Sequence, residues 1–327
     1  MITNKHNIPL ALAVWAVTDD YDRVNDAISA TALLKPVRQV VLSERLEAND
    51  KTPLDVSDLL ASAFGKALHS ATELTWLNLD KVKNGLRVLG YDDHSISNIK
   101  INPKAEECNE YTIPVYVEQR ITRLLDGVKI TGKYDLVAEG ILQDYKSTSA
   151  LSWVYGNNDS NYILQGSIYR WLDAGQSNPV ITEDIIAINY FFTDWSRASA
   201  LQSPAYPQQR VLQKQLTLMS LEETEQWIRN RLHQINVARG LEESEVQDCT
   251  DEDLWFSKSK YKYYKDASKV NGRSTRTFDT YEEAFLEKQK RNNDEGIILE
   301  SKGEPKRCAY CSAYNICSQR LRYFPNL

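Results

Sequence analysis

The sequence lacks any long hydrophobic run. No apolar stretch approaches the roughly 18 residues that a membrane-spanning helix requires. Residues 1–10 also lack a basic segment followed by a long apolar stretch, so no secretory signal peptide is predicted. We therefore expect a cytoplasmic protein with no membrane partner.

An excess of basic residues is also missing. The 327-residue chain has 45 acidic residues against 39 lysines and arginines, a net charge of −6. Such a chain is not a generally basic nucleic-acid binder, and any contact with nucleic acid must come from local patches. A hydrophobic content of 42% and a charged content of 26% are typical of a globular protein. The sequence contains no internal repeat and no low-complexity tract.

Cysteine is scarce, and its few positions are informative. Because no export signal is predicted, the five cysteines are expected to be reduced thiols or metal ligands rather than disulfides. Three of them form Cys308-x2-Cys311-x5-Cys317, and Cys249 precedes that cluster by 58 intervening residues. Four thiolates can close a zinc site or hold an iron–sulfur cluster. Cys108, the fifth cysteine, fits a buried free thiol or the fourth ligand.

Hydrophobic periodicity predicts an α/β core. Apolar residues at three- and four-residue spacing predict helices, and segments rich in β-branched and aromatic residues predict strands. Residues 111–148 and Ile185–Trp195 read as β structure. The predicted helices are Asp55–Leu77, Asn161–Ala174, Ser220–Arg239 and Thr280–Lys290. We expect one unit over residues 1–240, which includes an amino-terminal helical part, and a cysteine-bearing module over residues 241–327.

The helix Ser220–Arg239 has clear ends in the sequence. Ser220 can cap its amino terminus, Glu223 completes a capping box, and Gly240 can end it.

Two acids and a lysine form the most informative segment, which reads as a hairpin. Its strands are predicted at Ile130–Val137 and Ile141–Thr148, with a turn at Gly140. Side chains alternate along a strand, so Asp144 and Lys146 share a face. Tight pairing of the two strands would bring Asp135 close to Asp144. An acid pair beside a lysine suits a divalent metal ion and a phosphate.

Other polar residues accompany the hairpin in a fixed order. His69 lies on the first predicted helix and Glu118 on the preceding strand, while Gln165 and Tyr169 share one face of a later helix. Each alone is weak evidence: a single histidine on an amphipathic helix is more often structural, and a strand aspartate is often a surface residue. Their order and spacing together carry the functional inference.

This ordered set resembles the PD-(D/E)XK nuclease superfamily, specifically its RecB-like branch. The family motif runs as a Gly-x-x-His helix, a strand Glu, a Gly-x-x-Asp strand, an Asp/Glu-x-Lys strand and a Gln-x-x-x-Tyr helix. The chain matches it over about residues 55–195, although three residues rather than two separate Gly65 from His69. The resemblance implies a restriction-endonuclease-like core, a central mixed β-sheet flanked by helices.

The resemblance also implies the metal ligands. His69, Asp135 and Asp144 would bind Mg²⁺ or Mn²⁺, and the backbone carbonyl of Tyr145 would complete the shell. Glu118 would be an accessory acid near the metal or the water.

The remaining motif residues would act on the substrate. Lys146 would position the attacking water and stabilise charge on the phosphate, as phosphodiester hydrolysis requires. Gln165 and Tyr169 would brace the site and contact the DNA backbone.

The cysteine tail resembles the iron–sulfur staple of RecB-like nucleases. In those relatives the distant cysteine precedes the nuclease core, whereas no cysteine here precedes His69. Cys249 is therefore the better candidate for the fourth ligand, with Cys108 as the other. We favour a [4Fe–4S] cluster over zinc. Metal binding by Cys249 and the tail would close a loop that contains the most basic segment of the chain.

That segment, Phe256–Arg276, is a candidate DNA-binding surface. Aromatic residues, namely Phe256, Tyr261, Tyr263 and Tyr264, are interleaved with cations, a pattern that suits strand binding. A solvated two-stranded ribbon with outward lysines is the equally weighted alternative. The cations are Lys258, Lys260, Lys262, Lys265, Lys269, Arg273 and Arg276.

Three functional hypotheses follow from these observations. The first is a metal-dependent DNA nuclease, an exonuclease of the kind that tailed phages use in recombination, end processing or DNA degradation, acting in the host cytoplasm. DNA would be its partner, and a recombination or single-strand-annealing protein and oligomerisation are compatible with it. The second is a catalytically inactive DNA-binding or assembly protein on the same fold. The third is a zinc-stabilised regulator in which the acids are structural.

Overall fold

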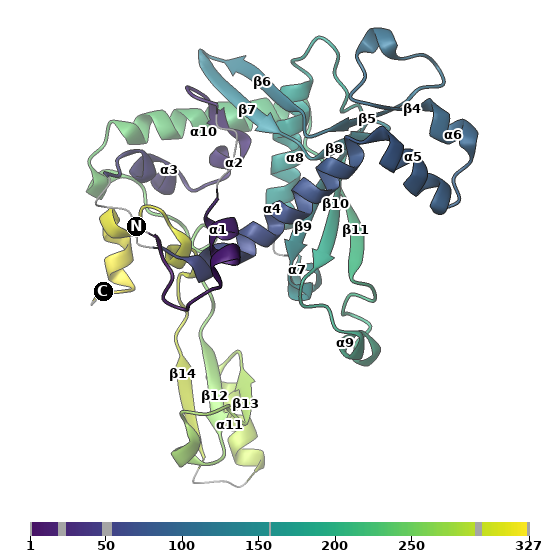
Figure 1. Ribbon diagram of the computed structural model, residues 1–327. Helices are drawn as coiled ribbons and strands as arrows, with labels where there is room; N and C mark the ends of the chain where they lie inside the picture. Colours follow the sequence, from purple (N-terminus) through teal and green to yellow (C-terminus); the bar gives the residue numbers. More distant parts are fainter. Residues whose placement is uncertain (1, 19–23, 48–53, 157, 292–295, 326–327) are drawn as a thin grey trace. The chain divides into compact units, whose positions relative to one another are not determined.

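The computed structural model describes residues 2–18, 24–47, 54–156, 158–291 and 296–325 (Figure 1). The chain divides into two compact units. The first comprises Met1–Leu34 and Pro53–Gln234, and the second comprises Lys35–Thr52 and Ile235–Leu327. Within the described ranges, no helix combines the length and the apolar character needed to cross a membrane.

A mixed six-stranded sheet organises the first unit. Its strand order is β11-β10-β9-β8-β5-β4. Strands β9 and β10 are parallel, as are β4 and β5, whereas the other neighbouring pairs are antiparallel. This sheet confirms the expected mixed α/β architecture. The strands are β4 (Ile99–Ile101), β5 (Ile113–Val117), β8 (Leu136–Ala138), β9 (Ile141–Thr148), β10 (Ile185–Phe192) and β11 (Val211–Thr217).

Two smaller sheets complete the β structure of this unit. The three-stranded sheet has the order β2-β7-β6, in which β2 is parallel to β7 and β6 is antiparallel to it. Its strands are β2 (Ile28–Ser29), β6 (Arg120–Leu125) and β7 (Val128–Lys133). A short parallel pair joins β1 (Ile2–Thr3) to β3 (Leu54–Asp55).

The structure corrects the predicted strand Ile130–Val137. The chain leaves β7 after Lys133 and enters β8, in the other sheet, at Leu136. The neighbouring segment is interrupted at the matching point, between β5 and β6, where Glu118 has a left-handed backbone with φ of 52°. The Glu118 N–H donates to the Asp135 carbonyl at 2.9 Å, so the two segments stay paired where both strands are interrupted. Bends of this kind re-aim side chains, and here they take the carboxylates of Glu118 and Asp135 out of the regular ladder.

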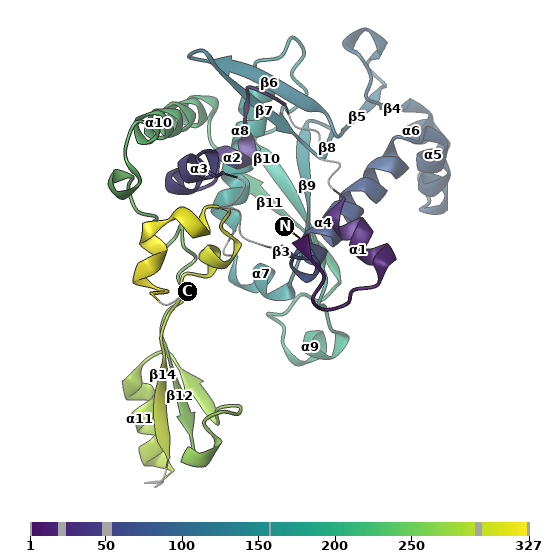
Figure 2. The same ribbon diagram turned by 60° about the vertical axis from the view of Figure 1, so that its left-hand side comes forward.

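Helices flank the sheets of the first unit (Figures 1 and 2). Helix α4 (Val56–Trp76) begins at a capping box of Asp55 and Asp58 and packs against β9 and α1. Helix α8 (Asp159–Asp173) contacts β6, β7, β10 and β11, and Ile168 and Leu172 are fully buried. The shorter helices are α1 (Leu10–Val17), α2 (Ala30–Leu33), α5 (Leu79–Val88), α6 (Asp93–Asn98), α7 (Ala150–Tyr155) and α9 (Arg197–Gln202).

The capping box predicted at Ser220 is confirmed. The Glu223 N–H donates to Ser220 Oγ at 3.1 Å, and the Ser220 N–H donates to Glu223 Oε2 at 3.0 Å. These bonds begin helix α10 (Leu221–Arg239), which ends before Gly240 as expected.

The second unit contains an antiparallel sheet with the order β13-β12-β14. Its strands are β12 (Lys260–Tyr264), β13 (Arg276–Phe278) and β14 (Ile297–Ser301), and α11 (Tyr281–Lys290) packs on them. The basic segment is therefore part of a helix-covered sheet rather than a two-stranded ribbon. Because β14 follows α11 in the chain, the local pattern of the basic segment could not show it.

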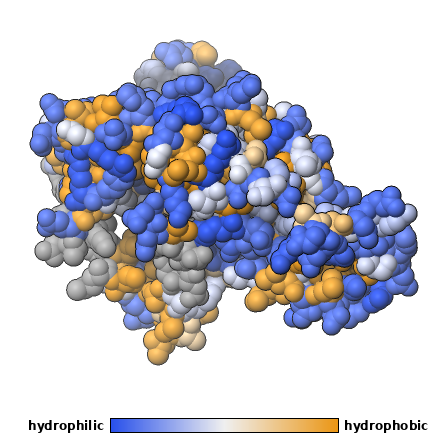
Figure 3. Space-filling model, turned by 90° about the horizontal axis from the view of Figure 1, so that it is seen from above, coloured by the Kyte–Doolittle hydropathy of each residue, from blue (hydrophilic) through white to orange (hydrophobic). Residues whose placement is uncertain are grey.

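The second unit also contains helix α3 (Val37–Glu44), the end of α10 from Ile235 onward and several 3-10 turns. The turns at Lys306–Tyr310, Tyr314–Ile316 and Ser318–Arg322 surround the carboxy-terminal cysteines. Figure 3 shows a mostly hydrophilic face on which apolar residues form separate patches, as is ordinary for a folded protein.

Candidate functional site

His69 and Asp135 meet between helix α4 and the central sheet. His69 lies in the middle of α4, and its Nδ1 is 3.1 Å from Asp135 Oδ1. The other oxygen, Asp135 Oδ2, accepts the backbone N–H of Tyr145 at 2.8 Å. Asp135 is thus fixed from two sides, by a helix residue and by strand β9.

Glu118 joins this pair. One ligand atom each from His69, Glu118 and Asp135 lie within 4.8 Å of one another, which is the single such trio of His, Cys, Asp or Glu in the described part of the chain. A nitrogen and two carboxylate oxygens are a donor set for a divalent ion such as Mg²⁺ or Mn²⁺. The bend at Glu118 is what places a residue of the β5–β6 connection beside the Gly-x-x-Asp segment.

Asp144 and Lys146 form an ion pair on the same face of β9, as the alternation predicted. Lys146 Nζ is 2.6 Å from Asp144 Oδ2, and Asp144 is 4% exposed. The ammonium of Lys146 also lies 5.3 Å from the centre of the Tyr162 ring on α8. Sequence reasoning missed Tyr162, although it is three residues before Gln165 and therefore on the same side of the helix.

The electrostatics of these groups favour a cation. Burial raises the pKa of Asp144, the nearby Asp135 raises it further, and Lys146 offsets this only in part. Burial also raises the pKa of Glu118. Burial lowers the pKa of His69, but the bond to Asp135 and its charge outweigh that effect, so the net shift is upward. Carboxylates crowded at low exposure repel one another until a positive ion or a proton joins them.

The Tyr145 backbone supports its assignment as a ligand. In a strand, the N–H and C=O of one residue point to the same edge. The Tyr145 N–H is bonded to Asp135, so its carbonyl is directed to that edge too, away from the neighbouring strand β10. Asp144, which the sequence predicts as a ligand, is not in the group of ligand atoms within 4.8 Å, whereas Glu118, predicted as an accessory acid, is.

Lys133 is a site residue that sequence reasoning missed. Its Nζ is 2.6 Å from Glu118 Oε2. Burial lowers the pKa of Lys133, but the bond to Glu118 more than compensates, so the pKa is raised. Lys133 occupies the first of the two unspecified positions of the Gly-x-x-Asp motif, and a lysine at that place was the available sequence signal.

Gln165 and Tyr169 are bonded to each other on helix α8. Gln165 Nε2 donates to the Tyr169 hydroxyl at 3.0 Å, and Tyr169 is 5% exposed. A Cβ atom at Gly132 would lie 2.7 Å from Tyr169 Cε1, so the ring packs directly against the glycine. This geometry supports the bracing part of the predicted role, because so buried a ring offers little surface to DNA.

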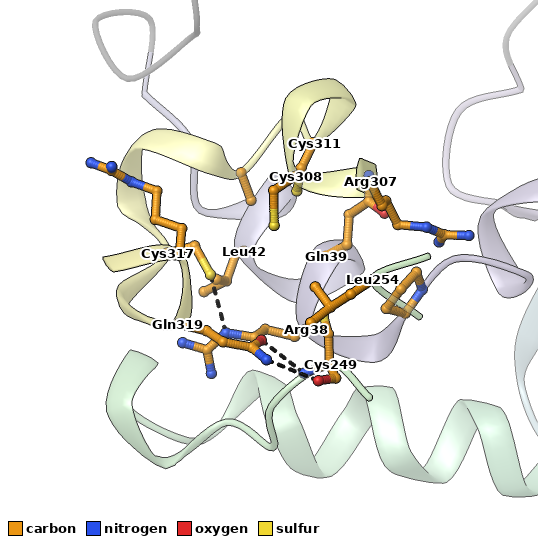
Figure 4. Close-up of a pocket in the computed structure, with 13 residues that line it drawn as sticks. Arg38, Gln39, Leu42, Cys249, Leu254, Arg307, Cys308, Cys311, Cys317 and Gln319 are labelled. Atoms are coloured by element: carbon orange, nitrogen blue, oxygen red, sulfur yellow. Dashed lines mark hydrogen bonds between the residues drawn. The ribbon is translucent and has the colours of Figure 1, made fainter. Parts of the chain in front are cut away.

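The second unit brings four cysteines together. Cys249, Cys308, Cys311 and Cys317 line one pocket, together with residues of α3, around a cavity of about 30 Å³ (Figure 4). Cys108 belongs to the first unit and does not line this pocket. Of the two candidates for the fourth ligand, the structure gathers Cys249 with the tail.

The cysteine pocket is electrostatically unlike the acidic site. Burial raises the pKa of Cys249 to about 12 and that of Cys308 to about 11. These groups are thiols in the metal-free protein, and metal binding would release their protons. Within the described residues, no three of the sulfurs lie within 4.8 Å of one another. Tetrahedral zinc with bonds of about 2.3 Å would need sulfurs about 3.8 Å apart.

The basic segment is partly neutralised by acids. Lys260 pairs with Asp279, Lys269 Nζ is 3.3 Å from Asp266 Oδ2, and Arg276 Nη1 is 3.0 Å from Glu287 Oε2. Of the other cations of the predicted patch, Lys262 lies on β12, and Lys258, Lys265 and Arg273 lie in the connections beside the strands. The patch is thus weaker than the sequence suggests.

The aromatic residues of this segment are also less available than expected. Tyr263 and Tyr264 are buried, so they cannot act as stacking faces for bases.

Comparison with known proteins adds little to this geometry. No protein-family model matches the chain, and no curated protein matches it. A solved structure described as "Crystal structure of SSO0001" is similar with a TM-score of 0.40 and 14% sequence identity, covering 68% of this chain and 84% of that one. A similarity at this level carries no argument about the fold or the function of this chain.

Proposed function

We propose that the protein is a metal-dependent DNA nuclease of the RecB-like branch of the PD-(D/E)XK superfamily, working as an exonuclease in phage-type recombination, end processing or DNA degradation. The observation that carries this proposal is the convergence of His69, Glu118 and Asp135 within 4.8 Å, beside the ion pair of Asp144 and Lys146. These residues come from α4, the β5–β6 bend, the β7–β8 connection and strand β9. Their order in the chain is the order of the family motif.

The chain's own groups divide the work. His69, Asp135, Asp144 and the Tyr145 carbonyl would hold Mg²⁺ or Mn²⁺, with Glu118 as the accessory acid. When bound, the ion supplies Lewis acidity toward the phosphate and lowers the pKa of water.

Lys146 is the cation for the reacting phosphate. Burial lowers its pKa, but Asp144 raises it by more, so the side chain stays protonated. An ammonium held on the same strand face as a metal ligand can orient the water and stabilise charge that develops on the phosphate. The Tyr162 ring, whose centre is 5.3 Å from the ammonium, restricts the volume around it.

The second unit is proposed to hold a [4Fe–4S] cluster through Cys249, Cys308, Cys311 and Cys317, with zinc as the alternative. The support is the gathering of four thiols in one pocket. Cys249 and Cys308 flank the segment that contains β12, β13, α11 and β14. A metal centre there would close that segment into a loop.

Labelled linear and circular DNA, with blocked and free ends, tests the nuclease proposal in Mg²⁺ and in Mn²⁺. We expect the wild-type protein to degrade DNA from free ends. The variants Asp144→Ala and Lys146→Ala should lose cleavage and keep DNA binding. A matched control is Lys214→Ala, which removes a lysine paired with Asp159 outside the acidic site.

The outcomes separate the hypotheses. Absence of cleavage with either ion, in folded and metal-loaded wild-type protein, would refute the nuclease proposal. Retained DNA binding would then indicate an inactive DNA-binding protein, and loss of both would favour a regulator. Wild-type turnover by Lys146→Ala would remove the proposed site.

A further inference from the structure

A buried arginine lies beside the cysteine pocket. Arg38, on α3, is 2% exposed, and all of its guanidinium nitrogens have partners. Burying a charge is costly unless every donor is satisfied, so the partners of the guanidinium indicate the role of Arg38. One of those partners is a cysteine sulfur: Arg38 Nε–H donates to Cys317 Sγ at 3.3 Å (Figure 4).

The other bonds of Arg38 converge on the same stretch of chain. Arg38 Nη2 donates to Ser318 Oγ at 3.1 Å and also pairs with Glu243. Glu243 Oε1 in turn accepts the Ser318 N–H at 2.9 Å. Arg38 and Glu243 therefore hold Ser318, the residue that follows Cys317, by its hydroxyl and its backbone N–H. Together with the bond from Arg38 to the Cys317 sulfur, these contacts fix the position of that sulfur.

Charge balance alone does not account for this geometry. Glu243 pairs with Arg38 through Nη2, and the Val246 carbonyl accepts from Nη1, so both ends of the guanidinium are satisfied without the sulfur. A thiol is a weak acceptor, whereas a thiolate is a strong one for a charged donor. A permanently charged N–H aimed at Cys317 is most favourable when that sulfur is a thiolate, as in a metal ligand.

We propose that Arg38 is a positioning residue of the cysteine-ligated centre, which retains Cys317 as a ligand and raises the reduction potential of the cluster. The inference rests on the metal content proposed above. Electrons added to a cluster increase its negative charge, and a hydrogen bond from a cation to a ligand sulfur stabilises that more negative form. Removing the bond should therefore make the cluster harder to reduce and easier to lose.

The test uses full-length protein purified with its metal and the variants Arg38→Lys and Arg38→Gln. Lysine keeps the charge but has a single nitrogen, so it cannot replace the bonds that the three guanidinium nitrogens make to Cys317, Val246 and Ser318. Glutamine removes the charge. The matched control is Arg45→Lys: Arg45 lies on the same segment and donates to the carbonyls of Ala238, Arg239 and Leu241 but to no sulfur.

Two readouts are independent of DNA cleavage. The first is the rate at which a chelator removes the metal, which we expect to rise about tenfold or more in both Arg38 variants and to be unchanged in Arg45→Lys. The second is the midpoint of a reductive titration followed by electron paramagnetic resonance. We expect a midpoint lower by about a tenfold change in the one-electron equilibrium, which corresponds to about 59 mV.

Wild-type metal retention and an unchanged midpoint in folded Arg38→Lys and Arg38→Gln would overturn the inference. If Arg38→Gln does not fold, Arg38→Lys decides. If the purified chain contains zinc, the chelator rate decides alone, and a chain that holds no metal refutes the inference. Because the wild-type cleavage assay does not involve Arg38, failure of the nuclease proposal would be seen there and not in these readouts.

Discussion

Gly132→Ala tests the packing behind the acidic site. Gly132 lies in β7, three residues before Asp135, and its Cα faces the ring of Tyr169 on α8. An added Cβ would lie 2.7 Å and 2.8 Å from two ring carbons of Tyr169 and 3.0 Å from Leu172 Cδ1. Both partners are buried, so neither can swing into solvent.

The cost follows from these distances. Carbon atoms pack at about 3.5–4.0 Å, so the ring or the strand must move by about 1 Å. Overpacking of this size costs about 1–3 kcal/mol of unfolding free energy. The loss of glycine freedom in the unfolded chain returns about 0.4–1 kcal/mol, which leaves a net loss of about 1–2 kcal/mol. A shift of β7 also displaces Asp135, and catalytic groups tolerate only about 0.5 Å, so cleavage should fall at least about tenfold.

Urea unfolding and the DNA cleavage assay measure the two effects. The midpoint of unfolding should fall at constant slope, which identifies a change in stability. The matched control is Gly65→Ala in helix α4, where nothing lies within 4 Å of the new Cβ, and which should stabilise the protein by about 0.5–1 kcal/mol. The double variant Gly132→Ala with Tyr169→Leu should lose less stability than the sum of its parts. A Gly132→Ala protein at least as stable as the wild type would refute the packing described here.

The remaining predictions concern the acidic site and the cap of helix α10. The pKa of His69 is raised above 6.5 by Asp135, so a proton competes with the metal below that raised pKa. Mn²⁺ affinity, measured by titration calorimetry, should therefore rise with pH through a midpoint above 6.5. A flat affinity profile from pH 6 to 8.5 would exclude His69 as a ligand. In the metal-free protein the same pair should stabilise the fold below about pH 6.5 and lose that contribution as pH rises through the raised pKa. Lys133→Met removes the ammonium 2.6 Å from Glu118 and makes the site more negative by one charge, so Mn²⁺ should bind more tightly or in greater number, and unchanged calorimetric titration would contradict this. Ser220→Ala removes the observed helix cap and should lower the unfolding free energy by about 1 kcal/mol, whereas an unchanged urea midpoint would show that the capping box contributes nothing.

The acidic site could be predicted in its members but not in its geometry. The motif order placed His69, Asp135, Asp144 and Lys146 together, because strand alternation and helix periodicity are local properties of the chain. The break at Glu118 could not be predicted, since a left-handed glutamate has no sequence signal of its own. The pairing of Glu118 with Lys133 depends on that break.

The division of the chain shows the same limit. The sequence places a boundary near Gly240 and groups everything before it, whereas Lys35–Thr52 belongs with the second unit. Helix α3 has three buried residues at helical spacing, Arg38, Val41 and Leu42. This spacing predicts only that one face of the helix is buried. Which segment covers it depends on contacts between residues about 200 positions apart, such as that of Arg38 with Glu243.

The order of residues was sufficient to predict the α/β class, the caps of α10, the shared strand face of Asp144 and Lys146, and the clustering of three cysteines. Each of these depends on residues within a few positions of one another, where backbone geometry fixes which side chains can meet. The folded arrangement of the chain was needed to show that Cys249 joins the tail, that Tyr169 packs on Gly132, and that Arg38 reaches the Cys317 sulfur. Those contacts join segments distant in sequence, and they form because buried surfaces and buried charges must find partners when the whole chain folds.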